Sequence, residues 1–87
     1  MRITVEVLLD RVVENQIRRG GEPTAALAVE AGEVRGIRYG DGILLPIGKV
    51  VGLAKQMAMA EGGTPTDVVR WIVERGQIVA VDVECEG

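Results

Sequence analysis

Two closely spaced turns constrain the fold of this chain more than any other feature. Asp41-Gly42 suits a type I′ hairpin turn, in which both central residues adopt positive φ, and a second, less specific turn is predicted around Ala31-Gly32. The segments beside these turns are short and rich in apolar residues, as strands are. We therefore predict three antiparallel strands, over residues 25–31, 34–39 and 43–47, joined as a meander.

An apolar stripe at helical spacing precedes the meander and predicts a helix over residues 4–19. Thr4 is a suitable N-cap and Gly20 a suitable stop. The first residues also alternate between apolar and polar, so a strand over 2–7 is an alternative. We predict a loop over 20–23. The helix would bury one aliphatic side, made of Val5, Leu8, Leu9, Val12, Val13 and Ile17.

Two helices and a strand are predicted after the meander. The first helix covers 49–61 and ends at a pair of glycines. The second covers 64–75, because Thr64-Pro65-Thr66-Asp67 combines an N-cap, a proline at the first helical position and an acidic capping-box residue. Alternating valines then predict a strand over 77–85.

These elements define a single α+β domain over residues 1–87, with an N-terminal helix, a three-stranded antiparallel meander, a helical hairpin and a C-terminal strand. We find no internal repeat in the sequence. Hydrophobic residues make up 47% of the 87 residues, which is enough for a core. A chain this short buries only a modest fraction of its surface, so a second copy is expected to cover its apolar edges.

The residue types present favour a non-catalytic protein. The chain has no serine and no histidine, so the usual pairs of nucleophile and base are missing. Cys85 lies between two glutamates, which disfavour its thiolate form, and we interpret it as a structural thiol. Asp10 and Glu14 lie one helical turn apart and are interpreted as solvated charges, with Glu14 paired to Arg18. We predict no catalytic residue, no cofactor and no metal site.

Residues 54–75 would form two helices joined by a tight turn, with a small residue, Ala58, where the helices cross. Residues 64–81 resemble the second helix and following strand of excisionase-like and MerR-like winged helix-turn-helix regulators, and with the preceding helix the resemblance covers residues 54–81. The resemblance implies that the second helix enters the major groove of DNA. The residues implied to bind DNA are Thr66, Asp67, Arg70 and, as a phosphate contact, Arg75. The acidic residues Asp82 and Glu84 depart from the basic wing of those families.

The distribution of charge favours a protein partner over nucleic acid. Residues 1–76 hold ten basic and ten acidic side chains, and the net charge of −3 comes from the acidic final strand. We therefore predict a protein-interaction or oligomerisation module that forms homo-oligomers, dimers or larger, with strand 77–85 as the pairing edge. The alternative is a regulator that binds double-stranded DNA through residues 54–75. The single cysteine and the lack of a long apolar segment favour a cytoplasmic protein outside the membrane.

Overall fold

The computed structural model describes residues 1–21 and 23–86, which form two helices and six strands. It is an α+β fold with two three-stranded antiparallel sheets, ordered β1-β6-β5 and β2-β3-β4. In chain order, the elements are β1 (Arg2–Thr4), α1 (Val5–Arg18), β2 (Ala25–Glu30), β3 (Glu33–Tyr39), β4 (Ile43–Pro46), α2 (Ile47–Ala60), β5 (Thr64–Glu74) and β6 (Gln77–Glu86).

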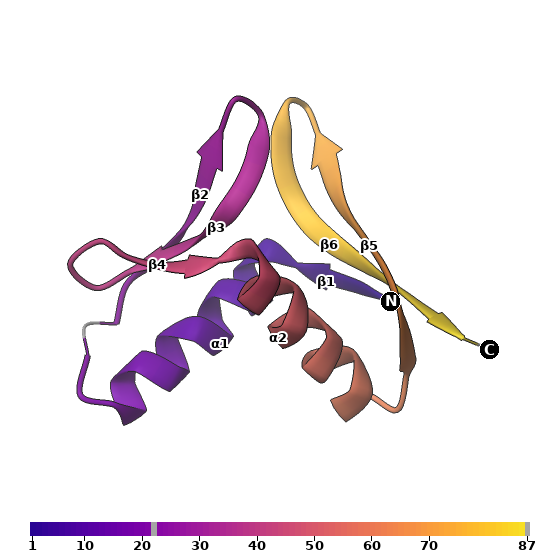
Figure 1. The fold of residues 1–87 in the computed structure, drawn as a ribbon, viewed down its shortest axis with the longest axis horizontal. Helices are drawn as coiled ribbons and strands as arrows, with labels where there is room; N and C mark the ends of the chain where they lie inside the picture. The colour runs from indigo at the N-terminus through magenta and orange to yellow at the C-terminus, as the bar shows by residue number, and fades with distance from the viewer. Residues whose placement is uncertain (22, 87) are drawn as a thin grey trace.

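The chain consists of two halves with the same order of elements. Each half is a strand, a helix and a β-hairpin: β1-α1-β2-β3 in the first and β4-α2-β5-β6 in the second. Figure 1 shows the two halves related by an approximate two-fold axis that is vertical in the view, with the hairpins above and the helices below. The prediction of no internal repeat is therefore wrong at the level of structure.

The halves exchange their first strands. β1 pairs with β6 of the second half, and β4 pairs with β3 of the first half. Each sheet thus combines the hairpin of one half with the leading strand of the other. This exchange closes the two halves around one core, because neither sheet is complete without the other half of the chain.

Both helices are 14 residues long and end in the same way. The α1 end is closed by Gly20, at φ 77°, which donates its N–H to the Ile17 carbonyl over 3.0 Å. The α2 end is closed by Gly62, at φ 87°, which donates to the Met59 carbonyl over 2.9 Å. Glycine adopts this left-handed conformation without a steric penalty, so each glycine marks a helix end in the sequence. The helix starts differ, because Thr4 caps α1 while Pro46 offers α2 no side-chain cap.

The two hairpins share their turn and their irregularity. Ala31-Gly32 and Arg75-Gly76 are both two-residue turns with positive φ at each position, as a type I′ turn requires. The strand register shifts at equivalent positions in both hairpins, between Ala28 and Val29 in β2 and between Ile72 and Val73 in β5. Equivalent residues of the hairpins are thus 44 positions apart, as Gly32 and Gly76 are. In the helices the offset is 42, as it is between Val5 and Ile47.

The core lies where the two sheets and the two helices meet. Each helix buries the same two positions, Leu8 and Val12 in α1 and Val50 and Ala54 in α2. Both sheets contribute further buried residues to the same core. The core cluster comprises Ile3, Leu8, Val12, Ile37, Val50, Ala54, Met57, Ala58, Val81 and Val83. Aliphatic side chains dominate this core, and the only tryptophan, Trp71, packs against its edge.

Most of the predicted elements are confirmed, and one is wrong. The N-terminal helix, the meander, the helix before Gly62 and the final strand form close to the predicted bounds. The alternative strand over 2–7 is limited to residues 2–4, after which the helix starts. The type I′ turn predicted at Asp41-Gly42 is wrong, because three residues, Gly40 to Gly42, join β3 to β4 and Asp41 does not adopt positive φ. The two-residue turn of the meander is Ala31-Gly32. Within the predicted loop over 20–23, Glu22 lies outside the described residues.

The helical hairpin is not formed, because residues 64–74 are strand β5. This segment carries five β-branched or aromatic residues in a row of six (Val68, Val69, Trp71, Ile72 and Val73), and these favour strands. It also continues directly through the Arg75-Gly76 turn into β6. The hydroxyl of Thr66, expected in a helix start, instead accepts the N–H of Val68 over 3.2 Å within an irregular stretch of strand.

Candidate binding surfaces

The four residues predicted to bind DNA are spread along β5. Thr66 and Asp67 lie at one end, where Asp67 pairs with Lys55 of α2 over 3.0 Å. Arg70 lies in the middle, directly opposite Asp82 of β6, and Arg75 lies in the turn at the far end. At about 3.3 Å per residue, Thr66 and Arg75 are roughly 30 Å apart along the strand. No recognition helix presents them, so the helix-turn-helix has no counterpart in the structure.

The predicted pairing edge is also wrong. β6 is the central strand of its sheet, with β1 on one side and β5 on the other. One acidic residue of β6 lies between basic residues of both neighbouring strands, because Asp82 is flanked in register by Arg2 and Arg70. The edges of the two sheets are instead β1, β5, β2 and β4.

Two clefts lie at equivalent places in the two halves, each between the start of one helix and the end of the other. The β4 cleft has a volume of about 440 Å³ and is lined by Val12, Asn15, Gln16, Arg19, Tyr39, Leu45, Gly48, Lys49, Gly52, Leu53 and Gln56. The β1 cleft has a volume of about 340 Å³ and is lined by Met1, Arg2, Ile3, Thr4, Val7, Arg11, Met57, Ala60 and Glu61. Leu45 in the first cleft corresponds to Ile3 in the second.

Each sheet also has an outer face, on the side away from the core. Ile37 and Leu45 pair in register and pack in or against the core, so the neighbouring pairs Gly36–Pro46 and Arg38–Leu44 face outward. We call Ala26, Ala28, Gly36, Arg38, Leu44 and Pro46 the β3 outer face. The equivalent β6 outer face consists of Arg2, Thr4, Arg70, Ile72, Ala80 and Asp82.

The β6 outer face is covered by its own charged side chains. Arg2 on β1 and Glu74 on β5 form an ion pair of 2.9 Å that extends across β6. The small residue Ala80, between these two strands, is fully buried. Asp82 pairs with the N-terminal amino group over 3.5 Å, while Arg70 forms no ion pair among the described residues. The face therefore presents a charged, polar surface.

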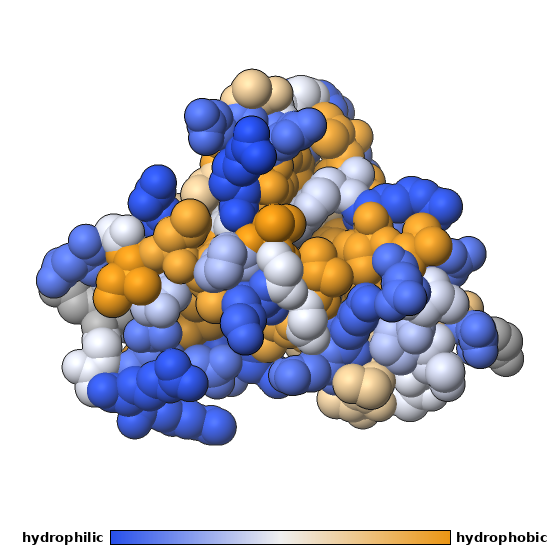
Figure 2. Space-filling model, viewed as in Figure 1, coloured by the Kyte–Doolittle hydropathy of each residue, from blue (hydrophilic) through white to orange (hydrophobic). Residues whose placement is uncertain are grey.

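The β3 outer face is open and apolar. Leu44 stands where the other face has Arg2, and its side chain is 40% exposed. A hollow of about 700 Å³ lies over this face, lined by Ala28, Val29, Glu30, Arg35, Arg38, Leu44, Pro46 and Ile47. Figure 2 shows the exposed hydrophobic side chains over β4, at the left of the view. No charged pair within the described residues bridges β2 and β4 across this face.

The remaining residues singled out in the sequence include Cys85 and Glu14. Cys85 is half-buried, and its thiol donates to the Val83 carbonyl with an Sγ–O distance of 3.6 Å. Glu14 pairs with Arg11, over 3.8 Å, rather than with Arg18 as predicted. Among the described residues no group of three or more metal-binding side chains comes together. In the same part of the chain no helix is long and apolar enough to span a membrane.

No protein-family model, no curated protein and no solved structure matches this chain. Function must therefore be argued from the surfaces themselves. Sequence reasoning missed both the β4 cleft and the β3 outer face, because each combines residues from separate elements. One signal for the cleft was present in the sequence: two glycines one turn apart, Gly48 and Gly52, inside a segment with helical periodicity.

Proposed function

We propose that this chain is a protein-interaction module that forms homodimers through its β3 outer face. The observation that supports this function is the contrast between the two outer faces. The same sheet architecture carries Arg2 on one side and Leu44 on the other, and the second face carries a hollow whose lining includes exposed apolar side chains. Exposed apolar hollows rimmed by polar residues are typical of interaction sites.

A second copy of the chain is a suitable partner, because the charges around the hollow are self-complementary. Glu30 lies beside the hairpin turn, and Arg38 lies at the other end of β3. In a two-fold contact with the hairpins antiparallel, Glu30 of each copy meets Arg38 of the other. Ala26, Ala28 and Gly36 have small side chains or none, so the two sheets can approach closely.

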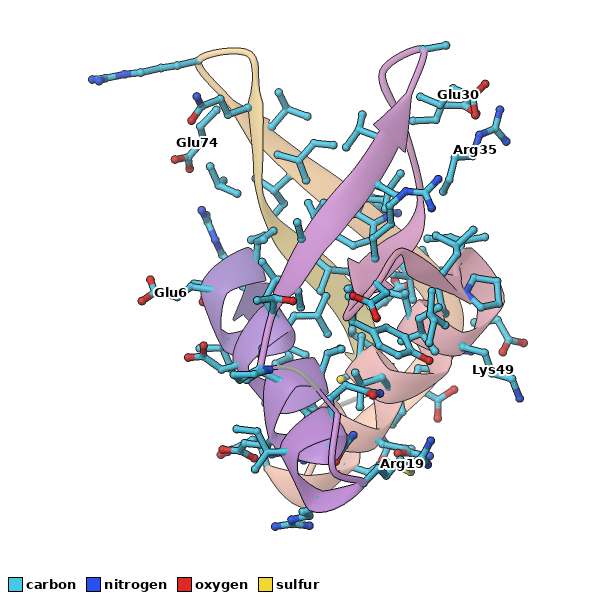
Figure 3. The ribbon with its side chains drawn as sticks, turned by 90° about the vertical axis from the view of Figure 1, so that its left-hand side faces the viewer. Glu6, Arg19, Glu30, Arg35, Lys49 and Glu74 are labelled. Atoms are coloured by element: carbon cyan, nitrogen blue, oxygen red, sulfur yellow. The ribbon has the colours of Figure 1, made fainter. Side chains whose placement is uncertain are left out.

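The size of the chain is compatible with a stable dimer. A standard interface buries about 800 Å² on each partner, which is roughly a seventh of the 5654 Å² surface of this chain. Figure 3 shows Glu30 and Arg35 side by side near the hairpin turn, and their ion pair of 3.8 Å is more than half exposed. Exposed pairs of this kind contribute little to stability, so either residue is free to pair with a partner.

Sedimentation equilibrium tests this function. The wild-type chain is expected to be a dimer, and Leu44→Arg, which installs the residue of the equivalent β6 face, is expected to be a folded monomer. Ile17→Arg is the matched control, because Ile17 is 56% exposed on α1 and lies outside the hollow. A wild-type monomer at every concentration up to the solubility limit would overturn the proposal.

The charge pairing has its own test. Glu30→Arg and Arg38→Glu should each weaken the dimer, because each places like charges opposite one another across the interface. The double variant should regain the affinity, since both pairs are restored with reversed sign. Failure of the double variant to recover, while Leu44→Arg still dissociates the dimer, would contradict the antiparallel arrangement.

A further inference from the structure

The β4 cleft gathers polar side chains that have no partner within the described chain. Asn15, Gln16 and Arg19 come from α1, Lys49 and Gln56 from α2, and Tyr39 from β3. None of these six side chains forms a hydrogen bond or ion pair with another described residue. Their donors and acceptors are therefore available to a molecule that enters the cleft.

The charge of the cleft is positive. Arg19 and Lys49 line it, and no aspartate or glutamate does so among the described residues. Figure 3 shows both cations on the same side of the molecule. The equivalent β1 cleft has Glu61 in place of Arg19 and Val7 in place of Lys49. The β1 cleft has cations of its own, Arg2 and Arg11, but these pair with Glu74 and Glu14. Among the described residues, the β4 cleft is therefore distinguished by cations that have no ion-pair partner.

The two glycines of α2 also lie in the β4 cleft. Gly48 and Gly52 line the β4 cleft one helical turn apart, and a Cβ atom built on either would meet nothing within 4 Å. Packing within the chain thus does not require glycine at these positions. Glycine inside a helix is unfavourable relative to alanine, and Gly52 lies well inside α2. Close approach of another molecule to the helix backbone is a physical reason for glycine at such a position.

From these observations we infer that the β4 cleft binds a small organic anion. The carboxylate or phosphate group of the ligand lies between Arg19 and Lys49, where charge-assisted hydrogen bonds hold it. The apolar body of the ligand packs against Leu45 and Leu53, over the space left by the glycines. The volume of about 440 Å³ is within the range of small-molecule sites. This site is separate from the dimer contact, since the two hollows share no residue.

Three naphthalene derivatives test the charge requirement: 1-naphthyl phosphate, 1-naphthoate and the neutral 1-naphthol. Each is titrated into the ¹⁵N-labelled chain, and binding is followed by the amide shifts of residues 12–19 and 48–56. Both anions are expected to shift these amides at lower concentration than 1-naphthol does. Tighter binding of the phosphate identifies phosphomonoesters as the ligand class, and tighter binding of the carboxylate identifies carboxylic acids. Equal binding of all three compounds, or shifts elsewhere in the chain, would overturn the inference.

Charge variants locate the site. Arg19→Gln and Lys49→Gln should each raise the dissociation constant of the tighter anion by about two- to fivefold, as expected for partly exposed ion pairs. Arg18→Gln is the matched control, because it removes the same charge one residue away, outside the cleft. An equal loss of affinity in Arg18→Gln would show that only the general charge of the helix end matters, which would overturn the site.

Gly52→Leu separates binding from folding. The new side chain enters open space, and leucine is a good helix former, so the melting temperature should rise. The same side chain fills the cleft, so anion binding should be lost. A variant that is more stable and still binds with wild-type affinity would contradict the inference. Leu44→Arg, which acts on the dimer contact, should leave the affinity for the anion unchanged, so the two proposals fail independently.

Discussion

The two halves of this chain have the same backbone and different surfaces. Their helices have equal lengths, and their hairpins share the type I′ turn and the position of the register shift. At equivalent surface positions the chemistry changes, from Leu44 to Arg2 and from Arg19 to Glu61. What the halves share is therefore the hairpin turns and two buried positions in each helix, whereas Met57 and Ala58 are buried in α2 alone. The exposed positions vary and distinguish one face or cleft from its counterpart.

The largest expected effect concerns a buried position that the halves share. Leu8 of α1 and Val50 of α2 occupy equivalent places and are almost completely buried. Leu8→Ala should lower the free energy of unfolding by about 3 kcal/mol, because it leaves a cavity in a small core. Val50→Ala removes fewer atoms and should cost about 2 kcal/mol.

Urea unfolding followed by the fluorescence of Trp71 measures both changes. The equivalence of the two helices is supported if Leu8→Ala lowers the free energy of unfolding more than Val50→Ala does. A decrease in the free energy of unfolding of less than about 1 kcal/mol for Leu8→Ala would contradict this equivalence, because the two helices would then not contribute to a common core in the same way.

The next effect concerns a position at which the halves differ. Gly36 of β3 corresponds to Ala80 of β6, but a Cβ on Gly36 would lie 2.0 Å from the Leu45 carbonyl oxygen. Gly36→Ala must therefore displace β4, and it should destabilise the chain by about 3 kcal/mol, at the upper end for overpacking. Ala80→Gly meets no such obstacle and should cost about 1 to 2 kcal/mol, from backbone entropy and a lost buried methyl group.

Both variants are compared by thermal unfolding monitored by circular dichroism. If Gly36→Ala is as stable as the wild type, β4 does not approach β3 as closely as the structure describes. Its pairing with the first half would then need revision.

The smallest effect on stability concerns the β6 outer face. Arg2→Leu removes the ion pair with Glu74 and gives this face the residue found at position 44. Both partners are more than half exposed, so the free energy of unfolding should change by less than about 1 kcal/mol. The expected consequence is association: with two apolar outer faces the chain should form species larger than a dimer, as measured by light scattering after size-exclusion chromatography. Glu74→Gln, which removes the ion pair without adding an apolar side chain, is the control and should remain a dimer.

The sequence alone predicted the elements whose signals are local. The apolar spacing of residues 5–17 and the glycines that close both helices gave α1 and α2 within a few residues. Short apolar segments between tight turns gave β2, β3 and β4, and alternation gave β6. None of the residues that line the β4 cleft was identified from the sequence as a candidate site, since a polar side chain on an amphipathic helix looks the same whether or not it lines a cleft.

The segment 64–75 shows where local signals mislead. Its threonines, proline and aspartate suit a helix start, and Gly76 suits a helix end, but the same residue types also form irregular strands and type I′ turns. The choice was decided by pairing with β6, from Thr64 opposite Glu86 to Glu74 opposite Gln77. That pairing satisfies the backbone of an 11-residue strand rich in valine.

The period of the apolar residues predicted which side of α1 faces the core, since Leu8 and Val12 are buried there, but the predicted burial of Ile17 at the end of the stripe is wrong because this side chain is 56% exposed. The tertiary structure alone decided that β1 pairs with β6 and β4 with β3, since strand exchange joins residues about 80 positions apart in the first case. It also decided which outward-facing residues meet across the clefts and faces, because a surface is assembled from elements that do not adjoin in the chain. The proposed dimer contact and the proposed anion site both depend on this tertiary arrangement, and physical measurements on single variants can test each of them.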